Sequence, residues 1–114
     1  MSYKVTKVDE ARSYDAKGHF DVRTTRLHDA DDVAGAVTMG LSHFLPGGGA
    51  EMAETPRELL YYIVEGQMTV YTDDEKSHAL NAGDSIHMSS TQRRSCKNTG
   101  HSAAKMLVVA CQPK

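Results

Sequence analysis

The residues that could do chemistry begin with an alternating set near the C-terminus: Arg94, Cys96 and Asn98. Alternate side chains of a β-strand point to the same face, so a strand here would present all three together. The guanidinium of Arg94 has no lone pair and stays charged, so it repels metal cations but can hold a carboxylate by two parallel hydrogen bonds. The set predicts a site for an anion.

Three glutamates, Glu51, Glu54 and Glu58, form an acidic cluster earlier in the chain. Glu54 or Glu58 could serve as a general base beside an anion held by Arg94. Two other interpretations are open. The glutamates could be solvated loop residues, or one of them could neutralise a buried Arg94, because buried charges are rarely left unpaired.

The adjacent tyrosines Tyr61 and Tyr62 should point to opposite faces of one strand. A tyrosine in a cavity can donate a hydrogen bond or act as an acid, although a buried tyrosine can also simply belong to the core. We expect Tyr61 to contact the substrate and Tyr62 to join the catalytic group. Met106 is expected to form part of an adaptable apolar wall, with core filling as the alternative. Cys96 could be a reactive thiol beside Arg94 or a core residue.

Two histidines leave a metal site open as an alternative. His43 lies in an apolar run that leads to Pro46, and His87 lies between Ile86 and Met88. Alternation turns His87 away from those two apolar side chains, toward the surface or a contact between two copies of the chain. Carboxylates together with imidazole could bind Mn²⁺ or Mg²⁺. Such a ligand set would be drawn from Glu51, Glu54, Glu58, His43 and His87.

The elements that must position these residues are short strands. Apolar runs, some alternating, at 20–27, 36–44, 59–64 and 105–111 are typical of strands, and the run at 59–64 is apolar enough to be buried on both faces. Clusters of turn residues separate the runs, including the glycines at 47–49, which would allow a tight turn. Residues 9–19 and 28–35 are polar and are expected to be loops or an arm. This pattern predicts a β-sandwich, jelly roll or barrel.

Length and composition restrict the function. A chain of 114 residues holds one ordinary domain. The net charge of −2 and the pI near 6.3 provide no basic surface for nucleic acid. No apolar segment suits a signal peptide or a membrane-spanning helix, and two cysteines form no disulfide framework. We therefore expect a cytoplasmic protein that binds neither nucleic acid nor membrane.

Four sequence features together resemble the two conserved motifs of the cupin superfamily: Pro46-Gly47-Gly48, ELLYYIVEG at 58–66, Ala82-Gly83-Asp84 and Asn98. The resemblance covers residues 36–112. It implies an all-β double-stranded β-helix, a jelly-roll barrel, in which residues 36–114 form the barrel and residues 1–35 form an N-terminal arm and the first strands. Small cupins pair, so a homodimer through an edge strand or the N-terminal arm is expected.

The metal ligands of the cupin motifs are missing from this chain. The family's motifs supply two histidines and a glutamate, then a third histidine at the position of Arg94. Counting back from Gly66 without gaps puts Ala53, Thr55 and Leu59 on the first three positions, and a slip of one residue puts Met52, Glu54 and Glu58 there. Neither register contains a histidine. The resemblance thus implies that the face of Arg94 lines the barrel cavity and that no metal cofactor is needed.

Three functions follow as hypotheses. The first is a metal-independent cupin that binds a small carboxylate-bearing metabolite in its cavity, with isomerisation, elimination or hydrolysis as reactions it could catalyse. The second is a non-catalytic binding or sensing module, and the third is a dioxygenase-like metallo-cupin with the Glu and His ligands named above. For the first we expect Glu54, Glu58 and Tyr62 to be catalytic, and the substrate to contact Arg94, Cys96, Asn98, Tyr61 and Met106.

Overall fold

A computed structural model describes residues 3–29 and 36–111 of the chain. The described residues form nine strands and one short 3₁₀ helix, η1 (Val8–Glu10). No helix in these described residues is long and apolar enough to cross a membrane. The strands are β1 (Arg12–Tyr14), β2 (His19–His28), β3 (Val37–Ala53), β4 (Glu58–Glu65), β5 (Gln67–Thr72), β6 (Ser77–Asn81), β7 (Ser85–Met88), β8 (Arg94–Lys97) and β9 (Ala104–Cys111).

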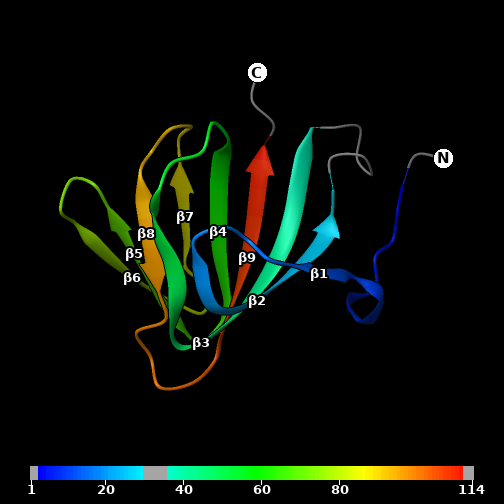
Figure 1. Ribbon diagram of the computed structural model, residues 1–114, viewed down its shortest axis with the longest axis horizontal. Coiled ribbons are helices and arrows are strands. Elements are labelled where there is room, and N and C mark those ends of the chain that lie inside the picture. Colours follow the sequence, from blue (N-terminus) through cyan, green and yellow to red (C-terminus); the bar gives the residue numbers. More distant parts are fainter. Residues whose placement is uncertain (1–2, 30–35, 112–114) are drawn as a thin grey trace.

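The strands form a curled sheet in the order β6-β5-β8-β3-β9-β4-β7, and β2 joins it by pairing with β3 (Figure 1). The paired neighbours of these strands are antiparallel. The expected all-β jelly-roll barrel is therefore confirmed. So are strands at 20–27, 36–44, 59–64 and 105–111, which lie in β2, β3, β4 and β9.

Strand β3 is 17 residues long and bends to serve both halves of the barrel. Its first part, Val37 to Phe44, pairs with β9, and its second part, Gly49 to Ala53, pairs with β8. The expected tight turn at the glycines is wrong, because they lie inside this strand. A Cβ on Gly49 would lie 2.0 Å from the carbonyl oxygen of Cys96, so only glycine lets β3 and β8 approach this closely.

The N-terminal segment is more ordered than its polar sequence predicts. Residues 12–14 of the expected loop form β1, which pairs with β2 so that Tyr14 lies opposite Thr24. The Thr24 hydroxyl donates a hydrogen bond to the Tyr14 carbonyl, and the Arg26 guanidinium lies 4.4 Å from the Tyr14 ring centroid. These contacts are made across two strands, which a local pattern cannot show. Of the second expected loop, residues 30–35 lie outside the described part of the chain.

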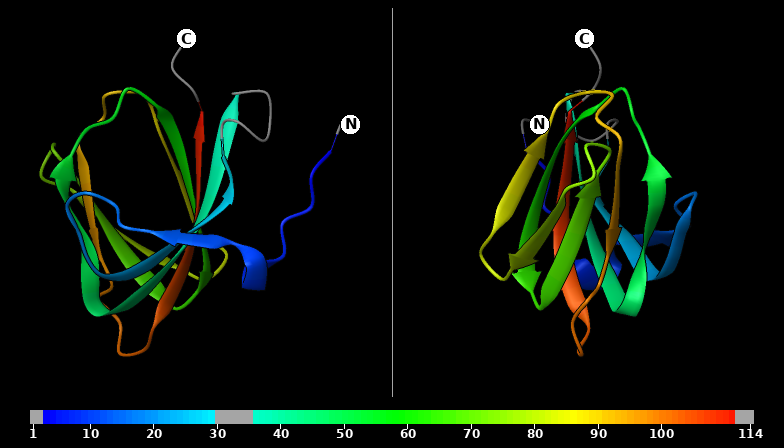
Figure 2. Two further views of the ribbon diagram at one scale, coloured as in Figure 1. Left: turned by 45° about the vertical axis from the view of Figure 1, so that its right-hand side comes forward. Right: turned by 90° about the vertical axis from the view of Figure 1, so that its left-hand side faces the viewer.

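The core lies between the curled halves of the sheet (Figure 2) and takes alternate residues from each strand. On β4, Leu59, Tyr61 and Ile63 are buried while Leu60 and Tyr62 are exposed. The expectation that β4 is buried on both faces is thus wrong for the single chain. Within the described residues no second layer covers that face, so its apolar outer residues are left open. Three of the methionines also belong to the core: Met68, Met88 and Met106.

Candidate functional site

Arg94, the first residue of β8, reaches into the barrel between β3 and β4. Its Nε donates a hydrogen bond to the Tyr61 hydroxyl at 3.3 Å, and its Nη1 donates one to the Ala53 carbonyl at 2.8 Å. Within residues 3–29 and 36–111, no carboxylate lies within ion-pair distance of Arg94. The predicted neutralising glutamate is therefore not found there, and neutral oxygens are the only hydrogen-bond partners of the guanidinium in this part of the chain.

Tyr61 is almost fully buried on β4, and burial raises the pKa of its hydroxyl, an effect that the nearby Arg94 partly offsets. The phenol is therefore protonated at neutral pH. Because the oxygen accepts from Arg94, the phenolic proton can be donated to a bound group. Tyr61 and Arg94 together present two donors, one neutral and one charged.

Cys96 and Met106 lie deeper, in the apolar core. Burial raises the pKa of the Cys96 thiol to about 11, with the Ala50 backbone and Arg94 acting in the opposite direction. Cys96 is thus a protonated core thiol at neutral pH rather than a nucleophile. Both residues are core residues, Cys96 two positions after Arg94 on β8 and Met106 on β9.

Asn98 is buried, and its side-chain amide is used by the chain itself. Nδ2 donates to the carbonyls of Phe44 and Ser102, and Oδ1 accepts from the Gly100 amide at 2.9 Å. Both amide protons are therefore engaged. Asn98 holds the turn between β8 and β9 and thereby fixes β8, which carries Arg94.

The residues expected to be catalytic are not brought together with Arg94. Glu54 is exposed on the segment between β3 and β4. Glu58 and Tyr62 lie on the outer face of β4, because alternation turns them away from buried Leu59 and Tyr61. The Glu58 carboxylate pairs with His87 of β7, which is exposed as expected.

Of the residues named for a metal site, Glu58 and His87 contact each other. In the described ranges, no three His, Cys, Asp or Glu side chains are grouped so that they could hold a metal ion. His43 lies on the outer face of β3, opposite Lys105 of β9. Its pKa is lowered by burial and by the positive charges of Lys105 and Arg23.

Sequence reasoning missed a cavity of about 260 Å³ at the mouth of the barrel. Its walls are inward-facing residues of β3 and β9, with Tyr14 of β1 and Arg26 of β2 on one side and Arg57 on another. The Tyr14 hydroxyl lies over Gly40, where an added Cβ would be in ordinary van der Waals contact at 3.6 Å. The lining residues are Tyr14, Ala16, His19, Arg26, Thr38, Gly40, Arg57, Val108 and Ala110.

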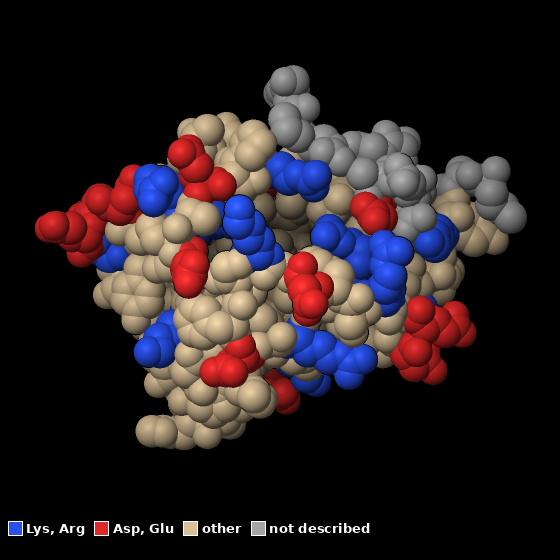
Figure 3. Space-filling model, in the orientation of Figure 1, with Lys and Arg blue, Asp and Glu red and all other residues tan. Residues whose placement is uncertain are grey.

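Among the described residues, the cavity lining contains two arginines and no carboxylate. Arg57 lies just before β4, four residues after Ala53, the residue whose carbonyl accepts a hydrogen bond from Arg94. Figure 3 shows Lys and Arg side chains gathered around a hollow near the middle of this face of the molecule. The local field favours a negatively charged ligand. The alternation Val22-x-Thr24-x-Arg26 was the one available signal, because it turns Arg26 inward with β2 once the strand is known.

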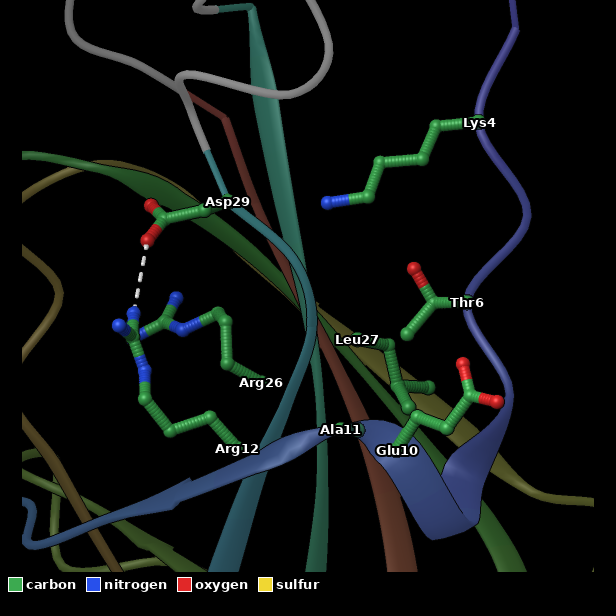
Figure 4. A pocket seen from close by; sticks show the side chains of 8 residues that line it. All are labelled: Lys4, Thr6, Glu10, Ala11, Arg12, Arg26, Leu27 and Asp29. Carbon is green, nitrogen blue, oxygen red and sulfur yellow. Dashed lines mark ion pairs between the residues drawn. The ribbon is translucent and has the colours of Figure 1, made fainter.

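A second cavity, of about 350 Å³, adjoins the first at Arg26, which lines both. It lies between the N-terminal segment and the paired strands β1 and β2. Figure 4 shows Lys4 reaching into it from one side and Arg12 and Arg26 from the other, with Asp29 paired to Arg12 at 3.5 Å. Arg26 therefore separates the barrel interior from a polar outer space.

The family model for the cupin domain matches residues 40–110, and the chain belongs to the cupin family. The expected resemblance is thereby confirmed, and the curled antiparallel sheet described above agrees with it.

The individual proteins that this chain resembles have different names. A beta-D-galactosidase of Mycobacterium tuberculosis is 34% identical over 113 residues, which cover 96% of this chain and 95% of the relative. Among solved structures, the polyketide cyclase RemF of Streptomyces resistomycificus aligns with a TM-score of 0.83 at 18% identity, over 96% of this chain and 79% of its own. A predicted oxalate decarboxylase of Thermotoga maritima aligns with a TM-score of 0.82 at 18% identity, over 95% and 98%. The two structures are similar in fold.

Proposed function

We propose that this chain is a metal-independent cupin that binds a small carboxylate-bearing metabolite in its barrel. The observation that carries the proposal is the cavity at the barrel mouth, where Arg26 and Arg57 face a space whose lining holds no carboxylate. A guanidinium pair in a partly enclosed space is stabilised when an anion enters, because charge-assisted hydrogen bonds strengthen away from bulk water.

The residues have separable roles in this proposal. Arg26 and Arg57 hold the carboxylate, and the Tyr14 ring, already stacked under Arg26, fixes the orientation of that guanidinium. Arg94 and the Tyr61 hydroxyl contact a second polar group of the ligand, beside the core residues Cys96 and Met106. Glu54, on the segment between β3 and β4 that also carries Arg57, is the candidate proton carrier if the ligand is turned over.

A direct test is isothermal titration calorimetry with a panel of small mono- and dicarboxylates, in wild type and in the variants Arg26→Gln and Arg57→Gln. Loss of one charge-assisted hydrogen bond costs about 1.5–3 kcal/mol, so Kd should rise at least ~10-fold in each variant. Arg23→Gln is the matched control, because Arg23 is exposed on the outer face of β2. Equal binding by all variants, or no carboxylate bound at all, rejects the proposal.

A glycoside is the second class of ligand that we propose, because the relative at 34% identity is named a beta-D-galactosidase. Hydrolysis of a glycoside requires two carboxyl groups flanking the bond, at most ~9.5 Å apart. Because the described lining of the cavity holds none, both would have to come from outside it, with Glu54 as one of them. Release of the chromophore from a nitrophenyl β-D-galactoside, abolished by Glu54→Gln, would support this reaction. If the wild type releases no chromophore, glycoside hydrolysis is rejected, and the carboxylate proposal is unaffected.

The remaining parts of the proposal concern the metal and the partner. Elemental analysis of protein purified without a metal-chelating tag should give no stoichiometric Mn, Fe, Ni or Zn. A stoichiometric metal overturns metal independence and favours the alternative Glu and His site.

The chain is also proposed to act in the cytoplasm as a homodimer, without nucleic-acid partners.

A further inference from the structure

The cavity between the N-terminal segment and strands β1 and β2 is not used by the proposed function. Its volume of about 350 Å³ is that of a small-molecule site. The described lining includes three basic side chains, Lys4, Arg12 and Arg26, and two acidic ones, Glu10 and Asp29. Figure 4 shows the Glu10 carboxylate well apart from the two guanidinium groups, whereas Asp29 lies beside Arg12. We call this space the N-terminal cavity.

Two of the basic residues, Arg12 and Arg26, are directly opposite each other in the antiparallel pairing of β1 with β2. Side chains at opposite positions share one face of the sheet, with Cβ atoms about 4.5–5.5 Å apart, and like charges there are destabilising. Asp29 offsets only part of this repulsion, because its pair with Arg12, at 3.5 Å, joins side chains that are 42% and 77% exposed. An anion that contacts both guanidinium groups would remove the remaining repulsion.

The Thr6 hydroxyl is an independent sign of a ligand. It is buried and has no hydrogen-bond partner among the described residues. Thr6 lines the N-terminal cavity, and Figure 4 shows its side chain and that of Lys4 directed from the N-terminal segment toward the strands. A buried hydroxyl without a partner is unfavourable, so it calls for a group that the cavity would bind. The hydroxyl can donate to an oxygen of an anion held by the basic side chains.

We propose that the N-terminal cavity binds a phosphate group, whose oxygens accept from Arg12, Arg26 and the Thr6 hydroxyl. Phosphate is favoured over a second carboxylate because its oxygens point in several directions and can accept from three side chains on different elements. A carboxylate has only two oxygens, which lie in one plane. Lys4 adds a further positive charge from the N-terminal segment.

Arg26 connects this cavity with the one at the barrel mouth, because it lines both. Its guanidinium has five N–H donors, so it can contact an anionic group in each space. The ligand class that follows is a small phosphorylated carboxylic acid, with its carboxylate in the barrel mouth and its phosphate in the N-terminal cavity. This step rests on the proposed function, whereas the phosphate site by itself does not.

Isothermal titration calorimetry with inorganic phosphate tests the site by itself. Arg12→Gln should raise the phosphate Kd ~10-fold by removing a charge-assisted hydrogen bond, and Thr6→Val ~5-fold by removing a neutral one. Both residues line the N-terminal cavity and neither lines the cavity at the barrel mouth, so these variants leave the carboxylate site intact. Lys7→Gln is the matched control and should leave Kd unchanged, because Lys7 is exposed on the same segment outside the lining.

A variant of opposite sign separates binding from a purely structural effect. Asp29→Asn removes the negative charge beside Arg12 and should therefore lower the phosphate Kd ~3-fold. A residue that only supported the fold would weaken binding when changed. Circular dichroism checks that each variant is folded, and Lys4→Gln replaces Arg12→Gln if the latter is not.

Succinate and its analogue phosphonopropionate, in which a phosphonate replaces one carboxylate, test the ligand class. We expect the wild type to bind the phosphonate at least ~10-fold more tightly than succinate, because only the phosphonate satisfies the N-terminal cavity. Arg12→Gln should reduce this preference. Equal affinity for the two compounds overturns the phosphorylated ligand while leaving the carboxylate proposal standing.

The failures of the two proposals are distinguishable. A wild type that binds no inorganic phosphate at ~10 mM, or a phosphate Kd that neither Arg12→Gln nor Thr6→Val changes, overturns the phosphate site whether or not succinate binds. Binding of phosphate that responds to both variants supports the site. If the same protein binds no carboxylate, the phosphate site stands and the proposed function is rejected.

Discussion

Single residues on the barrel interior differ in how their polar atoms are used. The Asn98 amide bonds only to other parts of the chain, whereas Arg94 donates to the Tyr61 hydroxyl, and both side chains keep a donor for a ligand. Cys96, two residues from Arg94, is too deeply buried to be charged. Arg94, Cys96 and Asn98 therefore share one strand face but differ in chemistry, because their burial and their hydrogen-bond partners differ.

Replacing Arg94 tests its part in binding. In Arg94→Gln the charge is lost while a polar side chain of similar length remains. We expect the Kd for a bound dicarboxylate to rise about 10-fold, from one charge-assisted hydrogen bond. Calorimetry measures this, with exposed Arg93→Gln as the control. An unchanged Kd would remove Arg94 from the site.

The thiol of Cys96 should resist alkylation in the folded protein. Its pKa of about 11 leaves almost no thiolate at pH 8, and burial also blocks access. We expect iodoacetamide to modify the Cys111→Ser variant only after guanidinium unfolding, as followed by intact mass. Modification of this variant at the rate of a free thiol would contradict the buried position.

At the scale of elements, the bend of β3 decides the architecture. Strand β3 pairs first with β9 and then with β8, and its bend lies at the three consecutive glycines 47–49. Strand β2 follows β3 on both sides of that bend and carries Arg26 to the mouth of the barrel. The site thus depends on the close approach of the β3 backbone to its neighbours at glycines that carry no functional group.

Gly49→Ala should destabilise the fold strongly. Its Cβ would lie 2.0 Å from a backbone oxygen of Cys96, so the strands must separate, at a cost of about 3 kcal/mol. Urea unfolding measures this free energy. In the control Gly83→Ala nothing lies within 4 Å of the new Cβ, and only the positive φ of +95° is strained, so the loss should be about 1–2 kcal/mol. Equal losses would show that the close approach is not tight.

At the scale of the whole molecule, charges from several strands converge on His43. Lys105 of β9 and Arg23 of β2 lower its pKa along with burial, while Glu65 acts in the opposite direction. The arrangement keeps His43 neutral at pH 7 on the outer face of β3.

The pKa of His43 predicts how stability depends on pH. Because the pKa is lower in the folded than in the unfolded chain, the unfolded chain binds more protons once the pH falls below about 6.5. The contribution of His43 to the unfolding free energy is thus complete above that pH and is lost as the pH falls from it toward the lowered folded pKa. Urea unfolding at pH 8 and pH 5.5 should show a smaller loss in His43→Gln than in wild type. An equal or larger loss in the variant would contradict the prediction.

The sequence by itself determined four of the nine described strands (β2, β3, β4 and β9), the fold class and the shared face of Arg94, Cys96 and Asn98. These follow from alternation and from turn residues, which act over a few neighbouring positions. Only the tertiary structure decided what each face meets: that Arg94 contacts Tyr61 rather than a glutamate, and that the outer residues of β4 lie open. It also brought Tyr14, Arg26 and Arg57 to one cavity from distant parts of the chain. Strand pairing creates such contacts between residues far apart in sequence, and no local pattern encodes them.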